Sequence, residues 1–545
     1  MKKINGKIWL EAVTSGAHNL KNKQNSINAL NVFPVPDGDT GSNMASTILS
    51  VLTGIDKDNT NISEVASKIA QNMLFSARGN SGVILSQIFR GFAVGFNNKE
   101  EINSYDLVKA FQSASNSAYK AVLKPIEGTI LTVIRETSEG LIDNALIDSD
   151  IEDIFTIALN LARKSCDNTP NLLKVLKEVE VTDSGGEGLY AVLEGMLSYF
   201  QGQPIQLLNV EDEVNKFISD TEVFEGEFGY CTEFILELKK PKKFNKDLLV
   251  NKLERIGSSM VVVQDNSILK VHIHAIRPGE VLNAVNSLGQ FIKVKIENMT
   301  LQANDSKKNT DNSNNKKETE NGELQKPKKS AVISCNSGAG IINLLKESGA
   351  SYIVEGGQTN NPSINDIVYA INSTNAETIF ILPNNSNIIL SAQQASTIIK
   401  DKKIIIIPTK SQAQALGILY NFSEENSIEE NHQLMKDALN SIHYGEIAPS
   451  IKTTKLDGIK VKAGEFMTIK EGKLINTAPT FNEAAIKLLN EMINEDTQIV
   501  TLFYGQGVTE ADISELQNYV EVNFDVQIDI YNGGQTIYPY LISTE

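Results

Sequence analysis

The sequence has 545 residues, of which 41% are hydrophobic, and a formal net charge of −17 at pH 7. That length predicts about three domains, each large enough to bury a core of its own. The negative charge argues against nucleic acid as a partner, because such binding depends on Lys and Arg residues that neutralise phosphates. Three cysteines are too few for a disulfide framework, and no apolar run is long enough for a signal peptide or a bilayer span. We therefore expect a cytoplasmic protein with no transmembrane segment.

The first 200 residues carry the pattern of amphipathic helices, with apolar residues recurring every three or four positions. We predict helices over residues 10–20, 44–52, 62–73, 83–92, 104–122, 129–142, 151–166, 171–179 and 188–200. Pro170 stands near the first turn of the 171–179 helix, where proline is favoured. Because strand patterns are nearly absent, this part of the chain predicts an all-α domain.

Two carboxylates lie in the stretch Asn31–Met44, between two of these helical patterns. Prolines keep the first half of the stretch extended, and Gly38 allows a turn that directs Asp37 and Asp39 toward one point. A cation would offset the repulsion between the two carboxylates, and Mg²⁺ prefers such oxygen ligands together with substrate phosphates. The stretch therefore predicts a Mg²⁺ site, whereas the alternative is an ordinary Asp-Gly turn.

Helix starts supply the second half of the predicted site. Thr40, Ser42 and Asn43 begin a helix whose free N–H groups can bind an anion. Glycine-containing loops precede further helices at 77–82, 128–129 and 183–186, and each is also consistent with a plain helix–helix turn. The G-x-G-x-x-A pattern at 186–191 lacks the preceding strand of a dinucleotide fold, and no P-loop motif occurs.

The stretch NVFPVPDGDTGSNM at residues 31–44 resembles the DhaL-type nucleotide-binding domain of dihydroxyacetone kinases. In this fuller form it is similar to the kinase subunit of bacterial two-component fatty acid kinases, and the similarity covers the whole chain apart from a polar linker. The resemblance implies an antiparallel barrel of eight helices that binds ATP at one end. It also implies that Asp37 and Asp39 hold Mg²⁺, with two ions expected, and Asn31 stands near a further ligand position.

The same resemblance assigns roles to the other loop residues. It implies that Asp37, Asp39 and Arg78 take part in catalysis. Around the adenine, ribose and phosphates of ATP it places Thr40, Gly41, Ser42, Asn43, Asn80, Ser81, Gly82, Thr129, Asp183, Ser184 and Gly185.

Beyond residue 203 the pattern changes to that of a small α+β unit with a candidate zinc site. His272 and His274 lie two apart on a predicted strand, so both face the same way. Cys231 lies on another strand, and a thiolate with two imidazoles is a good zinc ligand set. Glu233 is a candidate fourth ligand, and the alternative is three buried residues with no ion. The kinase proteins of the fatty acid kinase family resemble this chain in both motifs, which also implies zinc.

Residues 302–329 contain one leucine and no aromatic residue, so they predict a flexible linker that isolates the module after it. Strand and helix patterns then alternate, which predicts an α/β domain. Gly-Gly-Gln-Thr occurs at 356–359 and again at 533–536, each time after a strand, and indicates two similar half-domains. The region resembles the DegV-like fold. The expected domains are 1–203 (DhaL-like), 204–301 (α+β), 302–329 (linker) and 330–545 (DegV-like).

The resemblance implies ATP-dependent phosphorylation of a fatty acid to an acyl phosphate, for phospholipid synthesis from exogenous fatty acids. A carboxylate acceptor, with a pKa of about 4 to 5, is ionised at pH 7 and needs no general base. A separate carrier protein of DegV-like fold would present the fatty acid and bind the C-terminal domain, and we also expect a homodimer. The alternatives are a small-molecule kinase, as in dihydroxyacetone kinases, and a nucleotide-sensing scaffold.

Overall fold

The structure is a computed structural model that describes residues 1–32, 38–144, 149–208, 230–239, 258–265, 268–275, 277–298, 327–358, 360–450, 453–456 and 458–545, with 241, 244, 249, 252, 253 and 256. The chain divides into two compact units. The first contains Met1–Leu208 and Lys326–Glu545, and the second contains Asn209–Gln325.

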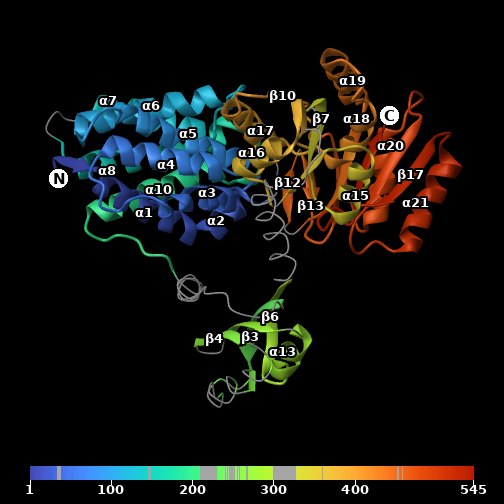
Figure 1. The fold of residues 1–545 in the computed structure, drawn as a ribbon, viewed down its shortest axis with the longest axis horizontal. Helices are drawn as coiled ribbons and strands as arrows, with labels where there is room; N and C mark the ends of the chain where they lie inside the picture. The colour runs from blue at the N-terminus through green and yellow to red at the C-terminus, as the bar shows by residue number, and fades with distance from the viewer. Residues whose placement is uncertain are drawn as a thin grey trace, which may run out of the picture. The chain divides into compact units, whose positions relative to one another are not determined.

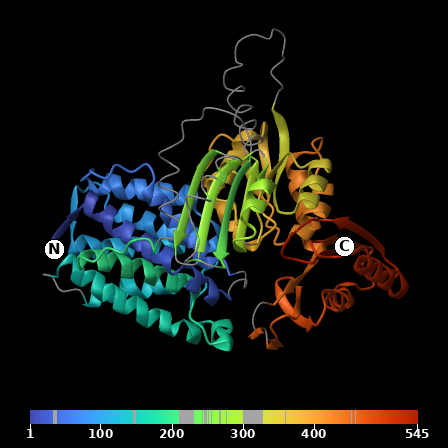
Figure 2. The ribbon, with the colours of Figure 1, turned by 90° about the horizontal axis from the view of Figure 1, so that it is seen from below.

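The first 208 residues form a helical domain (Figure 1). Its elements are β1 (Lys3–Asn5), α1 (Gly6–Asn22), α2 (Gln24–Leu30), α3 (Thr40–Ile48), a 3-10 helix (Leu49–Leu52), α4 (Ile62–Ser76), α5 (Gly79–Gly95), β2 (Glu101–Asn103), α6 (Ser104–Ala121), α7 (Ile130–Asn144), α8 (Ile151–Leu172), α9 (Lys174–Val179) and α10 (Ser184–Phe200). Seven helices form a closed ring in which each helix contacts the next. Their order is α1, α4, α5, α6, α7, α8 and α10, and α10 contacts α1. Helix α3 packs against α1, α5 and α10. The predicted all-α domain is confirmed, and Figure 2 shows its helices side by side.

Aromatic side chains fill the inside of this ring. Trp9 is fully buried, and its ring centroid lies 4.9 Å from that of Phe96 and 5.5 Å from that of Phe92. Phe111 contacts Phe92 and Phe155 in the same cluster. The barrel interior is therefore a packed core, and binding surfaces are left to its ends.

The end of α8 differs from the prediction. The sequence predicted a break before Pro170, but α8 runs through it to Leu172, and α9 is a separate short helix. Proline cannot donate to the carbonyl four residues earlier, which here belongs to Cys166. The hydroxyl of Thr169 donates to that carbonyl instead, at 2.7 Å, so the helix continues without an unsatisfied oxygen.

The C-terminal α/β domain contains two sheets. The first half has β7 (Lys328–Asn336), α15 (Ala339–Glu347), β8 (Tyr352–Glu355), α16 (Ile364–Ser373), β9 (Ala376–Leu382), α17 (Ser386–Ile398) and β10 (Lys403–Ile406). These strands form a parallel sheet in the order β10-β9-β7-β8. The second half has a 3-10 helix (Gln412–Gln414), α18 (Ala415–Tyr420), α19 (Ile428–Ser441), β11 (His443–Pro449), β12 (Thr454–Leu456), β13 (Ile459–Val461), β14 (Phe466–Lys470), β15 (Lys473–Ala478), α20 (Phe481–Met492), β16 (Ile499–Tyr504), α21 (Glu510–Asn523), β17 (Gln527–Asn532) and β18 (Tyr540–Thr544).

The second half of the domain forms a mixed sheet in the order β15-β14-β11-β18-β16-β17, with β12 and β13 as a separate hairpin. It resembles the first half in the place of its Gly-Gly pair. Each repeated Gly-Gly pair, at 356–357 and 533–534, follows the last strand at one edge of its sheet, β8 or β17. The predicted α/β class is confirmed.

The C-terminal domain packs against the helical domain. Helix α17 contacts α5, and α16 contacts α4 (Figure 1). Arg78 and Ser363 form an antiparallel backbone bridge, and the backbone N–H of Ile364 donates to the carbonyl of Ala77 at 3.1 Å. The linker composition led us to expect an isolated module, and the structure instead joins both domains in one compact unit.

The second unit is a small α+β domain, as predicted. Its strands β3 (Tyr230–Leu238), β4 (Ser258–Asp265), β5 (Ile268–Ala275) and β6 (Gly289–Asn298) form an antiparallel sheet in the order β4-β5-β3-β6. Helix α13 (Pro278–Val285) contacts β3, and Phe234, Leu236, Val271 and Val281 are buried in the core. Residues 302–326 of the predicted linker lie outside the described residues, and its last residues, Lys328 and Lys329, belong to β7. Where the chain is described, every helix is too short or too polar to cross a bilayer.

We expect Thr169→Val to lower the free energy of unfolding by roughly 2 kcal/mol. The Thr169 hydroxyl donates to the Cys166 carbonyl and accepts from the backbone N–H of Asp183 at 3.0 Å, so valine leaves two buried groups unpaired. Urea denaturation measures the change, with Thr169→Ser as the control that keeps the hydroxyl. Equal stability of the two variants would contradict this account of the helix end.

Candidate functional site

Four helix starts of the helical domain meet at one cavity in the first unit. Residues from the starts of α3, α5, α7 and α10 line it, and its volume is about 410 Å³. We call it the loop cavity. The predicted nucleotide or Mg²⁺ ligands that line it are Asn31, Asp39, Thr40, Asn43, Asn80, Ser81, Thr129, Asp183, Ser184 and Gly185. The structure thus brings together residues that the sequence spreads over 150 positions and more.

Gly41 and Gly82 lie outside the lining of the loop cavity, at contacts between helices. A Cβ atom on Gly41 would lie 2.3 Å from the backbone oxygen of Gln24, and one on Gly82 would lie 2.4 Å from Oγ1 of Thr47. Real Cβ atoms do not approach so closely. The structure thus requires glycine at both positions for close packing around α3, and the nucleotide contacts that the resemblance implies for them stay a prediction.

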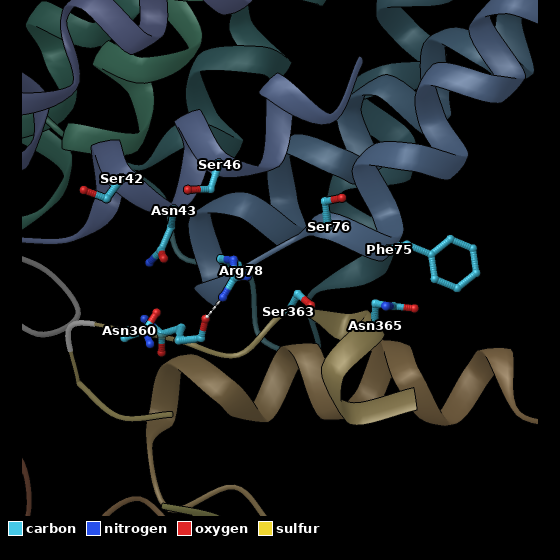
Figure 3. Close-up of a pocket in the computed structure, with 10 residues that line it drawn as sticks. Ser42, Asn43, Ser46, Phe75, Ser76, Arg78, Asn360, Ser363 and Asn365 are labelled. Atoms are coloured by element: carbon cyan, nitrogen blue, oxygen red, sulfur yellow. Dashed lines mark hydrogen bonds between the residues drawn. The ribbon is translucent and has the colours of Figure 1, made fainter. Parts of the chain in front are cut away.

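Arg78 and Ser42 line a second cavity of about 630 Å³, which we call the arginine cavity (Figure 3). Its lining consists of Ser42, Asn43, Ser46, Phe75, Ser76, Arg78, Asn360, Asn361, Ser363 and Asn365. The guanidinium of Arg78 donates to the backbone oxygen of Asn361 at 2.8 Å and lies 3.9 Å from the carboxylate of Asp366. Asn43 lines both cavities, so they are neighbours.

Asp39 is the buried carboxylate of the site, with 6% of its surface exposed. It precedes α3 as the N-cap residue, yet its side chain makes no capping bond to the helix. Its Oδ2 instead accepts a hydrogen bond of 2.5 Å from the side-chain amide of Asn361, 322 residues away. Asp37, the other predicted carboxylate, lies outside the described residues.

Asp183 ties the starts of two helices to the loop cavity. Its Oδ2 accepts from the backbone N–H of Gly186 at 2.7 Å, which caps α10. Burial raises the pKa of Asp183 to about 6, although hydrogen bonds from the backbone of Gly186 and Ile130 work in the opposite direction. A cation or a hydrogen-bond donor bound in the cavity would stabilise the ionised carboxylate and lower this pKa.

The C-terminal domain supplies one wall of the loop cavity, which the sequence analysis did not predict. That wall consists of Ser386, Asn387, Ile389, Leu390 and Gln393, at the start of α17. The side chain of Asn80 donates to Oδ1 of Asn387 at 3.0 Å across the domain contact. No local signal marks these residues, because their partners are about 300 positions away in the sequence.

Apolar residues from the end of α6 to the first turn of α7 form another part of the lining. They are Val122, Leu123, Ile126, Ile130 and Leu131, and Leu123 is 82% exposed. An exposed leucine beside a cavity offers apolar surface to a ligand. The loop cavity is thus polar around its carboxylates and apolar along this segment.

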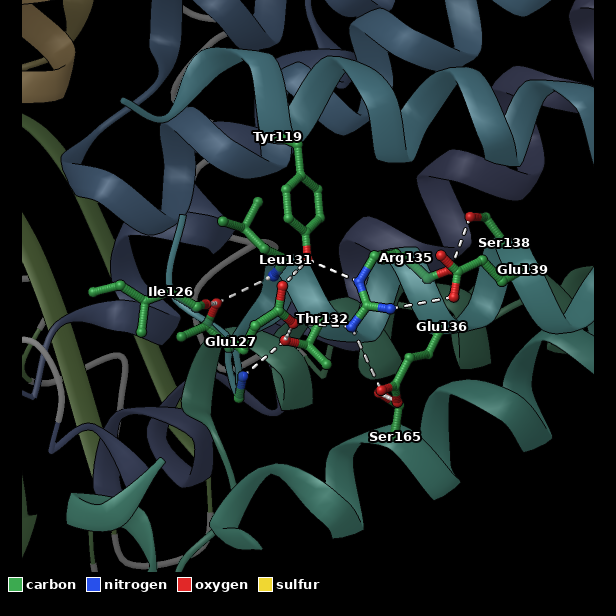
Figure 4. Close-up of polar contacts among 12 residues, drawn as sticks. Tyr119, Ile126, Glu127, Leu131, Thr132, Arg135, Glu136, Ser138, Glu139 and Ser165 are labelled. Atoms are coloured by element: carbon green, nitrogen blue, oxygen red, sulfur yellow. Dashed lines mark hydrogen bonds and ion pairs between the residues drawn. The ribbon is translucent and has the colours of Figure 1, made fainter. Parts of the chain in front are cut away.

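A hydrogen-bond network fixes this segment (Figure 4). Glu127 accepts from Thr132 at 2.6 Å, from Arg135 at 2.9 Å and from the hydroxyl of Tyr119 at 3.0 Å. Burial alone would raise the pKa of Glu127, but hydrogen bonds from Thr132, Arg135 and Tyr119 bring it below its ordinary value. The ionised carboxylate therefore joins the end of α6 to the start of α7.

Within the described residues, no three His, Cys, Asp or Glu side chains are grouped so as to hold a metal ion. The side chains of Cys231, Glu233, His272 and His274 lie outside the described residues, as Asp37 does. The backbone register of β3 and β5 is described, and it pairs Cys231 with His274 and Glu233 with His272.

Three family models match successive parts of the chain. The DAK2 domain matches residues 34–198. Two models of FakA-like fatty acid kinase proteins match residues 227–306 with their middle domain and 331–545 with their C-terminal domain. Uncharacterized proteins of Staphylococcus epidermidis and Staphylococcus aureus are 38% identical over 556 residues, covering 100% of this chain and of theirs. The chain belongs to the FakA-like fatty acid kinase family.

Solved structures are similar to parts of this FakA-like chain. A DegV family protein from Corynebacterium glutamicum has a TM-score of 0.32 and 11% identity, over 40% of this chain and 96% of its own. The dihydroxyacetone kinase of C. freundii in complex with AMP-PNP and Mg²⁺ has a TM-score of 0.28 and 17% identity, over 35% of this chain and 33% of its own. The family predicted from the sequence is confirmed by the family models and the full-length relatives.

We expect Asp183→Asn to stabilise the protein without bound cations at pH 8, by up to roughly 3 kcal/mol, but not at pH 4. The folded-state pKa of about 6 exceeds the ordinary 3.8, so the folded state loses stability as pH rises through this range and the buried charge forms. Asparagine has no charge to bury and still accepts from Gly186. Urea denaturation of both proteins at both pH values measures the difference, and a variant less stable than wild type at pH 8 would contradict the assignment.

Proposed function

We propose that this chain transfers the γ-phosphoryl group of ATP to a fatty acid, giving an acyl phosphate, and that the loop cavity binds the nucleotide. Membership of a kinase family supports the reaction class. The observation that carries the proposal is the convergence of the starts of α3, α5, α7 and α10 on one cavity. Helix N-termini present free N–H groups and a positive dipole end, so they favour phosphates.

The two sides of the loop cavity fit the two ends of ATP. Asn43, Asn80 and Ser81 offer amides and a hydroxyl near the helix starts, as phosphates and ribose require. Ile126 and Leu131 offer apolar surface, which suits a purine base. We therefore propose that the base lies along the α6–α7 segment and that the phosphates point toward Asp39.

Oxygen donors near Asp39 fit a divalent cation. The Asp39 carboxylate is buried, and Oδ1 of the neighbouring Asn361 is buried with no hydrogen-bond partner in the part of the chain that the structure describes. Mg²⁺ prefers carboxylate and amide oxygens. We propose that Asp39 holds Mg²⁺ together with Asp37, that a second ion and Asn31 belong to the same site, and that Mg²⁺ neutralises charge on the phosphates.

The chain's own residues then position the reactants. The acceptor carboxylate is ionised at neutral pH, so no side chain has to remove a proton from it. We propose that Arg78 is a positioning residue, since its guanidinium holds the backbone of Asn361 beside Asp39. We propose that the wall contributed by the C-terminal domain helps to keep water away from the transferred group.

Further features of the proposal concern the whole chain. We propose domains at 1–203, 204–301 and, from the start of β7, 328–545, with a linker at 302–327. We also propose a cytoplasmic location and self-association as a homodimer. The fatty acid comes from a separate carrier protein that docks on the C-terminal domain. Membership of the FakA-like family supports a lipid-related partner in general terms.

We also propose a zinc ion in the second unit. The register of β3 and β5 places Cys231 opposite His274 and Glu233 opposite His272. Cross-strand partners and positions two apart share one face of a sheet, so this register is compatible with a single tetrahedral ligand set.

We expect Asp39→Asn to reduce phosphoryl transfer at least 100-fold, because a neutral amide cannot balance the charge of Mg²⁺. ADP release with fatty-acid-loaded carrier measures the rate, and thermal unfolding checks that the fold persists. Asn372→Ala, on the exposed side of α16, is the matched control and should behave as wild type. Turnover by Asp39→Asn at the wild-type rate would contradict the assignment of Asp39 to the active site.

Elemental analysis of the purified chain should find about one zinc per chain, as one tetrahedral ligand set requires. Cys231→Ser and the double variant His272→Ala/His274→Ala should lose it. Cys335→Ala, which removes a buried thiol of the C-terminal domain, is the control and should keep the metal. Full zinc occupancy in the double histidine variant would rule this site out.

A further inference from the structure

We propose that Asn361 is a switchable ligand of the cation site, contributed by the C-terminal domain. Its amide nitrogen faces Asp39 when no cation is bound, and its amide oxygen faces Asp39 when a divalent cation is bound. The inference rests on the proposed function, in which Asp39 binds such a cation.

The contact between these two residues is buried and close. Asn361 is 2% exposed, and its Nδ2 lies 2.5 Å from Oδ2 of Asp39. Gly79 lies next to this contact with a φ of +57°, and a Cβ there would lie 3.6 Å from the amide of Asn361, an ordinary contact, but only 2.5 Å from the amide of Asn43. A side chain at position 79 would therefore displace the amide of Asn43, which lines both cavities.

The oxygen of the Asn361 amide lacks a hydrogen-bond donor within the described residues. This atom, Oδ1, is buried. A buried acceptor without a partner destabilises the folded state, and such an atom in a native protein calls for an explanation. An amide oxygen is a ligand that Mg²⁺ and Mn²⁺ accept, and this one lies on the side chain that touches the predicted metal ligand.

A half-turn of the amide exchanges its oxygen and nitrogen with little change in shape. The nitrogen is 2.5 Å from the Asp39 oxygen, and neighbouring oxygens in an octahedral Mg²⁺ shell are about 2.9 Å apart. Without a cation, two oxygens at this distance repel, so the nitrogen must face Asp39. With a cation, an N–H donor repels the metal, so the oxygen is favoured. The occupancy of the cation site therefore decides the orientation.

The backbone of Asn361 stays fixed while its side chain turns. Arg78 donates to its carbonyl at 2.8 Å, and the backbone bridge between Arg78 and Ser363 holds the following residues. Asn361 also lines the arginine cavity, which therefore borders this side chain. Cation affinity in the helical domain thus depends on the docked C-terminal domain.

Binding of Mn²⁺ to the full-length chain, with a non-hydrolysable ATP analogue and detection by electron paramagnetic resonance, tests the switch. Asn361→Ala removes both atoms and should weaken Mn²⁺ binding about 10-fold. Asn361→Asp keeps an oxygen but has no donor, so it should bind Mn²⁺ at least as tightly as wild type. Without a cation, the same variant should melt at a lower temperature than Asn361→Ala, because two carboxylates then face each other. Asn372→Ala should match wild type in both measurements.

If Asn361→Asp weakens Mn²⁺ binding as much as Asn361→Ala, then only the amide N–H donor matters and the switch is wrong. The proposed function would still hold in that case, provided that the wild-type chain binds Mn²⁺ and Asp39→Asn does not. If the wild-type chain itself fails to bind Mn²⁺ with the nucleotide analogue, both the proposed function and the switch are overturned.

Discussion

A buried carboxylate at the start of α3 is the constraint on which the site depends. Asp39 is removed from water without capping its own helix, and an unpartnered charge in that position would be costly. Its partner Asn361 belongs to another domain, which has to pack against α5 to bring the amide within reach. Gly38 and Gly79, with φ values of +65° and +57°, let the backbone turn on either side of this contact. Domain packing therefore supplies one of the hydrogen bonds to this buried carboxylate.

In the proposed function this arrangement would divide the work of phosphoryl transfer between two domains. The helical domain supplies helix starts and carboxylates to the loop cavity, which we propose as the nucleotide site. The C-terminal domain supplies one wall of that cavity and the Asn361 amide, which donates to the Asp39 carboxylate. Phosphoryl transfer depends mostly on positioning and charge stabilisation, so residues that hold ligands in place matter as much as the ligands. The proposed carrier would dock on the same domain that supplies one wall of the loop cavity.

The helical fold could be predicted from the apolar periodicity of the first 200 residues. The loops at 77–82, 128–129 and 183–186 were equally consistent with plain helix–helix turns, and only the family resemblance assigned them to one site. Asp183 caps α10 through its side chain, whereas α3 begins at Thr40 without a side-chain capping bond. The contributions of Asn361 and Asn387 could not be predicted, since they depend on how two domains pack and each partner is about 300 positions away. The linker composition showed only that the segment has no core of its own, and it carried no information on domain packing. Pro170 misled the prediction because a neighbouring hydroxyl replaces its missing donor.

The central claim is that one nucleotide site is built from both domains. Hydrogen–deuterium exchange of the full-length chain, with and without Mg²⁺ and a non-hydrolysable ATP analogue, tests it most directly. The account predicts that peptides covering 122–131 and 183–189 in the helical domain and 386–393 at the start of α17 become protected together at the same nucleotide concentration. Protection confined to the helical domain, with unchanged exchange at 386–393, would contradict it.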